Sequence, residues 1–153
     1  MTLLSSLDRP TSTEAGVGQI GDRYNETEIY ILIDGYSDEV YGIHALGAAH
    51  EVIDDEQGAA LRVHAAFERL LRLGLVLLGT LEPVDEALQR QDRLRTDVPV
   101  VDFAPWPGGI EGMAARLREL RTMADADDKC EFWAVSTPAG LRVGRALVDE
   151  VDQ

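Results

Sequence analysis

The spacing of apolar side chains along the 153-residue chain predicts four helices. They cover residues 40–50, 59–73, 113–124 and a C-terminal segment from 138 onward. In each of them apolar residues recur every three or four positions, while most charged residues fall on the other side. The chain therefore favours helices that bury one face against a common core.

Capping residues mark where these helices begin and end. Ser37, followed by two acids, fits the N-cap of the first helix, and Thr137 fits the N-cap of the last. Pro138 fits the first helical position, where its missing N–H has no partner in any case. Gly74 predicts the end of the 59–73 helix, because glycine adopts the left-handed conformation without strain.

Short apolar runs predict strands between the helices. Leu75–Leu78 and Phe132–Val135 are each too short for a buried helix and lie next to a turn or cap signal. The β-branched block Ile29–Ile33 fits either a short strand or a buried helical segment, and its periodicity does not separate the two. Helices and strands together predict an α/β fold of the α+β type.

The domain organisation follows from the segments without periodicity. Residues 1–27 combine Ser, Thr, Gly and acids and predict a flexible N-terminal arm, so that 28–153 forms a single domain. The polar stretch 82–131, with its own helix, is expected to be an insertion in that domain. Its role is open between a dimerisation arm and a lid over a ligand.

Two local patterns resemble the winged helix-turn-helix regulators of the PadR and MarR type. The segment Phe67–Val76 resembles the end of a recognition helix entering the first wing strand, and Phe132–Gly140 resembles the return strand and closing helix. Ile31–Ile43 is similar to the opening helices of the PadR type. The resemblance implies a winged-helix-like domain with an enlarged, helix-containing wing insertion, 82–131. It also implies transcriptional regulation through DNA binding, by a homodimer that reads paired half-sites.

Net charge restricts where DNA could bind. The chain holds 28 acids and 14 bases, a charge of −14, which disfavours non-specific binding of polyanions. Residues 58–81 are the exception, with three bases and one acid. In the 59–73 helix the candidate DNA contacts are Arg62, His64, Arg69 and Arg72, since guanidinium groups bind phosphate or guanine in pairs. The same arginines also fit the solvated face of an ordinary helix.

The acidic first third supports a different function. Residues 1–57 hold 12 acids and 2 bases and could present a phosphate-like charge density to a basic protein. The chain would then be an acidic protein-interaction or antagonist module that uses a winged-helix-like fold without DNA. Trp106, between two prolines, fits either a partner anchor or a plug that packs the insertion onto the core. The candidate homodimer surface is either the stripe Met113, Leu117 and Leu120 or the C-terminal helix.

Reactive chemistry is sparse. His44, His50, His64 and Cys130 do not fall at chelating spacings, so we expect neither a metal nor another cofactor. No set of acid, base and nucleophile can be assembled, and we expect a non-enzymatic protein. The longest apolar run is too short to span a bilayer, and the N-terminus lacks the features of a secretory signal. The expected location is therefore the cytoplasm, without a membrane partner.

Overall fold

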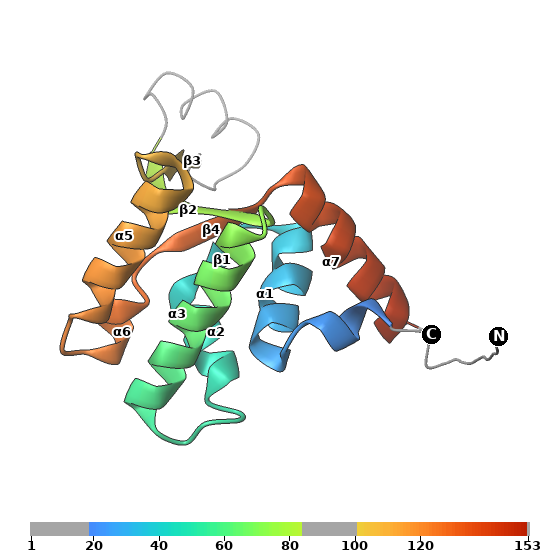
Figure 1. Ribbon diagram of the computed structural model, residues 1–153, viewed down its shortest axis with the longest axis horizontal. Helices are drawn as coiled ribbons and strands as arrows, with labels where there is room; N and C mark the ends of the chain where they lie inside the picture. The colour runs from blue at the N-terminus through green and yellow to red at the C-terminus, as the bar shows by residue number, and fades with distance from the viewer. Residues whose placement is uncertain (1–18, 84–100, 153) are drawn as a thin grey trace, which may run out of the picture.

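The computed structural model describes residues 19–83 and 101–152, and all statements below concern these ranges. The chain combines helices with one antiparallel sheet (Figure 1). The elements occur in the order η2 (Ile20–Arg23), α1 (Glu26–Ser37), β1 (Val40–Tyr41), α2 (Gly42–Ala49), α3 (Glu56–Arg72), β2 (Val76–Pro83), β3 (Val101–Pro105), α5 (Gly109–Arg121), α6 (Ala126–Lys129), β4 (Trp133–Ser136) and α7 (Pro138–Val151). The α+β class expected from the sequence is confirmed.

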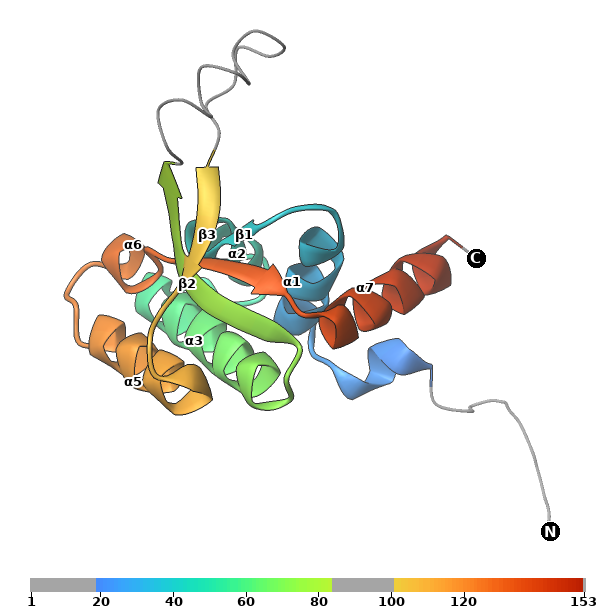
Figure 2. The same cartoon turned by 90° about the horizontal axis from the view of Figure 1, so that it is seen from above.

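The sheet has four strands in the order β1-β4-β2-β3, each antiparallel to its neighbour (Figure 2). The two strands expected from short apolar runs pair directly, with Leu77 of β2 opposite Val135 of β4. The second half of β2 extends beyond β4 and pairs with β3, where Leu81 lies opposite Phe103. The insertion thus adds a strand to one edge of the sheet.

The helices surround a core between them and the sheet. α1 packs against α7 and α3, while α5 lies beside α3 on the side away from α1 (Figures 1 and 2). Phe67 of α3 and Phe132 meet edge to face in this core, with ring centroids 4.9 Å apart. Both rings are almost fully buried, and they join the main helix of the domain to the segment that enters β4.

The N-terminal part of the domain decides one open sequence alternative and corrects one prediction. Ile29–Ile33 is helical, because Asn25 and Glu28 form a reciprocal capping box that starts α1 at Glu26. The helix continues to Ser37, so this residue ends α1 instead of capping the next helix, as predicted from the sequence. The chain then forms β1 before α2 begins at Gly42.

Part of the expected flexible arm, 1–27, is folded. The backbone N–H groups of Ile20 and Gly21, in η2, donate to the carboxylate of Glu150 on α7 at 2.7 and 3.2 Å. This contact anchors the start of the domain to its last helix, so the domain begins before residue 28. Residues 1–18 of the arm lie outside the described ranges.

The remaining capping predictions are confirmed. Gly74 has a φ of 76° directly after α3 and its C-cap, so the chain can turn into β2 without strain. The Thr137 hydroxyl accepts from the N–H of Gly140, and Pro138 is the first residue of α7. Within the expected insertion, 82–131, the predicted helix is α5, and residues 84–100 lie outside the described ranges.

Candidate functional site

The exposed face of α3 is the floor of the candidate site. α3 is packed by α1, α2, α5 and β2, and most of its apolar residues are buried. Leu61, Ala65 and Leu73 are the exceptions: they lie on the solvent side, and the exposed fractions are 48% for Leu61 and 51% for Leu73. At 3.6 residues per turn, these positions form a stripe that winds about 120° around the exposed side of the helix.

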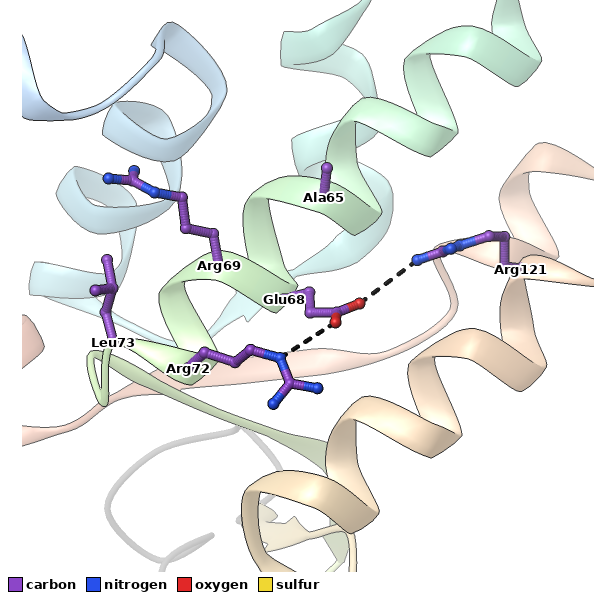
Figure 3. Close-up of a pocket in the computed structure, with 6 residues that line it drawn as sticks. All are labelled: Ala65, Glu68, Arg69, Arg72, Leu73 and Arg121. Carbon is purple, nitrogen blue, oxygen red and sulfur yellow. Dashed lines mark hydrogen bonds and ion pairs between the residues drawn. The ribbon is translucent and has the colours of Figure 1, made fainter.

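A groove of about 510 Å³ runs along this face (Figure 3). We call it the α3 groove, and its lining residues are Ala65, Glu68, Arg69, Arg72, Leu73 and Arg121. Five of the six come from α3 or the turn after it, and Arg121 reaches in from α5. The groove therefore combines an apolar floor with guanidinium groups at its sides.

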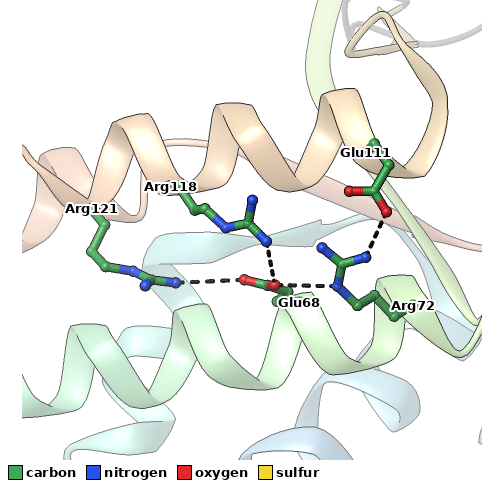
Figure 4. A network of polar contacts seen from close by, with 5 residues as sticks. All are labelled: Glu68, Arg72, Glu111, Arg118 and Arg121. Carbon is green, nitrogen blue, oxygen red and sulfur yellow. Dashed lines mark hydrogen bonds and ion pairs between the residues drawn. The ribbon is translucent and has the colours of Figure 1, made fainter.

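One side of the groove is held by an arginine cluster around Glu68 (Figure 4). The Glu68 carboxylate accepts hydrogen bonds from Arg118 at 3.0 Å and Arg72 at 3.3 Å, and it lies 3.6 Å from the Arg121 guanidinium. Arg72 also donates to Glu111 at 2.8 Å. Three cations and two carboxylates leave the cluster with a positive balance. These contacts bridge α3 and α5, which run antiparallel.

Electrostatics keep both carboxylates of the cluster ionised. Burial alone would raise the pKa of Glu68, but hydrogen bonds from Arg118 and Arg72 outweigh it and hold this pKa below its ordinary value. The hydrogen bond from Arg72 likewise lowers the pKa of Glu111. The cluster therefore persists as a set of full charges at neutral pH.

The other side of the groove is held by Arg69, which points toward α1. Its guanidinium donates to Glu28 at 2.7 Å and to the Arg23 carbonyl at 3.1 Å, and it lies over the Tyr24 ring. The Glu28 side chain is only 3% exposed, so this ion pair is anchored to the interior. Two turns earlier, the guanidinium of Arg62 donates to the Thr27 hydroxyl.

His64 is the one expected DNA contact that the structure contradicts. The side chain is 1% exposed, because α6 packs against this side of α3. Its Nε2 donates to the Lys129 carbonyl at 2.7 Å, and its Nδ1 finds no hydrogen-bond partner among the described residues. Burial lowers the pKa of the imidazole. His64 thus joins α3 to α6 and does not reach the surface.

The prediction that the stripe on the 113–124 helix is a free homodimer surface is also wrong. Met113, Leu117 and Leu120 are at most 5% exposed, because α5 turns this face onto α3 and β2. Trp106 packs against the core, with its ring centroid 5.9 Å from that of Phe132. Of its two sequence interpretations, the structure therefore favours the plug that fixes the insertion.

Sequence reasoning missed the contribution of α5 to the site. The periodicity of the 113–124 helix places Arg118 only on its polar side, opposite the apolar stripe. The spacing of three between Arg118 and Arg121 already puts both on one face. No pattern in the sequence indicates that this face lies beside α3. Likewise, the spacing of Leu61 and Ala65 fits a core stripe and does not reveal their exposure.

The site offers contacts for binding, through apolar surface and guanidinium donors. Among the described residues, no group of three or more His, Cys, Asp and Glu side chains is placed to hold a metal ion. Cys130 is fully buried, and burial raises the pKa of its thiol to about 12. None of the helices described here has the length and apolar character needed to cross a membrane.

The chain was also compared with known proteins. No protein-family model matches it, and neither a curated protein nor a solved structure matches it.

Proposed function

We propose that the chain is a non-enzymatic protein-interaction module on a winged-helix-like fold, and that a protein partner binds the exposed face of α3. The order of α1, β1, α2, α3, β2, β4 and α7 supports the fold assignment. So does the placement of β4 between β1 and β2, since the strands that frame the insertion are direct neighbours. The cytoplasmic location expected from the sequence belongs to the same proposal.

The observation that carries this function is the distribution of acidic and exposed apolar residues along α3, starting from its N-terminal end. In DNA-reading helix-turn-helix proteins, the N-terminal part of the second helix contacts the base edges. Here that end carries Asp54, Asp55 and Glu56, with Asp55 as the N-cap. The exposed positions that follow include the apolar Leu61 and Ala65. Acids would repel the phosphate backbone, whereas exposed apolar side chains gain from burial against protein.

The pairing of the arginines supports the same function. Arg69 is engaged by Glu28, and Arg72 by Glu68 and Glu111. A phosphate would have to bind beside these carboxylates or displace them. The candidate contacts from the sequence therefore also serve to attach α3 to α1 and α5.

A second candidate function is a regulator-like DNA-binding protein that acts as a homodimer. It is favoured by one specific observation: six of the nine arginines in the described ranges lie on α3 and α5. They are Arg62, Arg69, Arg72, Arg116, Arg118 and Arg121. A duplex docked across both helices would meet this concentration of guanidinium groups.

The interaction of a basic protein with the acidic first third, residues 1–57, also stays a prediction from the sequence.

Photo-crosslinking separates these functions without knowledge of the partner. A photoreactive amino acid replaces Leu61, and a matched variant carries it at Val52, which is similarly exposed but lies in the α2–α3 loop. In cells that express the chain, we expect an adduct at position 61 that protease removes and nuclease does not. A nuclease-sensitive adduct would establish the DNA function instead. Equal adducts at both positions would contradict a specific site on α3.

A further inference from the structure

We infer that the α3 groove takes an amphipathic helix of a protein partner that carries acidic residues along its edges. This inference rests on the proposed function of the α3 face. It adds the chemical class of the partner, which the fold and the proposed function leave open.

The shape of the exposed face fits a helix. The lining of the α3 groove runs from Ala65 to Leu73, eight positions, which corresponds to about 12 Å at 1.5 Å per residue. A partner helix of roughly two turns has the same length. Ala65, with its small side chain, lies at one end of this lining and lets a ridge of the partner approach the α3 backbone. The described lining offers no strand edge for an extended peptide, so helix-in-groove binding is the mode that fits.

The charge of the groove determines the polar residues of that helix. Each guanidinium of the arginine cluster has five N–H donors. Arg118 and Arg121 direct one nitrogen each toward the shared Glu68, which leaves most of their donors free within the described residues. Carboxylates are the partner groups that match such donors, and they can bind them in pairs. Acidic residues on the partner would therefore complete the cluster.

The acidic balance of the whole chain does not prevent this attraction. Charges are screened over about 10 Å at 0.1 M salt, so the nearest groups dominate binding. Asp54, Asp55 and Glu56 lie at the far end of α3 from Arg72. The two ends of the face thus have opposite charge, and the partner helix is oriented with its acids at the Arg72 end.

A displayed peptide library tests this inference on the intact chain. The library consists of helix-forming peptides of about 16 residues, four to five turns, with randomised apolar and charged positions. We expect enriched sequences with apolar residues at a spacing of three or four and acids beside them. Replacing Arg118 and Arg121 by alanine should weaken the best peptide at least about tenfold, a loss of roughly 1.4 kcal/mol. Both side chains are at least 40% exposed, so the variant keeps its fold.

The matched control removes the same two charges elsewhere. Arg142 and Arg145 lie exposed on α7, and their double alanine variant should bind the peptide within about twofold of the parent chain. If both double variants lost the same affinity for the peptide, the loss would reflect only the net charge of the chain, and the inference would be overturned. Enrichment of neutral or basic peptides, or no enrichment, would overturn it as well.

Two other occupants of the α3 groove, a second copy of the chain and duplex DNA, are tested with the same double variant. A dimer in sedimentation equilibrium that the Arg118→Ala/Arg121→Ala variant abolishes would assign the groove to a second copy. Duplex DNA whose binding the same variant abolishes would assign it to nucleic acid. Either result overturns the inference. The crosslink at Leu61 does not depend on partner charge, so a protein adduct together with basic selected peptides would refute the partner class alone.

Discussion

Leu117 provides the strongest test of the placement of α5. Its side chain is fully buried where α5 packs against α3 and β2. Leu117→Ala therefore opens a cavity within the monomer and loosens the helix that carries Arg118 and Arg121. If the stripe instead formed a homodimer surface, the same change would weaken association.

The size of the effect follows from burial. Leucine exceeds alanine by three carbons, and at about 0.8 kcal/mol each the lost transfer free energy is about 2.4 kcal/mol. The cavity left behind adds to this, and we expect the free energy of unfolding to fall by about 3 kcal/mol. For a chain of this size, the melting temperature should fall by roughly 9 °C. On the same helix, Ile110 is 41% exposed, and Ile110→Ala should cost no more than about 0.5 kcal/mol.

Urea unfolding followed by circular dichroism measures both variants. The experiment is run at two protein concentrations about 25-fold apart, because only a dimer gives a concentration-dependent midpoint. A loss below about 1 kcal/mol for Leu117→Ala would refute the packing. If Leu117→Ala lowered the free energy of unfolding only at the lower protein concentration, the result would support the stripe as a homodimer surface.

Two further predictions concern buried groups. Because burial lowers the pKa of His64 from its ordinary 6.5, the unfolded chain binds more protons below that pH. The His64 contribution to the free energy of unfolding should therefore be lost as pH falls below about 6.5, with no change above it. His64→Gln should lose less stability than the parent chain between about pH 7.5 and 5.5, and parallel pH profiles in urea titrations would contradict this. A Cβ at Gly140 would clash with the Leu75 carbonyl oxygen, whereas one at Gly47 in α2 meets open space. In thermal melts Gly140→Ala should cost about 1–3 kcal/mol and Gly47→Ala should gain about 0.5–1 kcal/mol, and the reverse order would refute the close approach of α7 to Leu75.

Local signals predicted elements whose boundaries depend on neighbours in sequence. Gly74, Thr137 and Pro138 act through backbone conformation and capping, which involve only a few residues. The block Ile29–Ile33 could not be assigned because a buried helix and a short strand can share one apolar pattern. Ser37 was misplaced because a cap at Asn25 had already started a helix that extends through it.

The candidate site was predictable only in part. The sequence indicated Arg69 and Arg72 as the basic face of one helix, and the structure places both at the α3 groove. It gave no indication that Glu68 would bind Arg118 and Arg121, since these residues are about 50 positions apart in the chain. Such contacts depend on the packing of α5, and periodicity along α5 gives only which side is apolar.

The sequence by itself determined the α+β class, the helices α2, α3, α5 and α7, the strands β2 and β4, and a single basic segment in an acidic chain, because these follow from local periodicity, capping and charge. Only the tertiary structure decided that α5 lies along α3. That packing buries Met113, Leu117 and Leu120 and brings Arg118 and Arg121 to Glu68. Apolar burial is non-directional, so a helical stripe specifies that a face is covered but not what covers it. Because α5 is the covering element, residues of α3 and Arg121 of α5 line one groove.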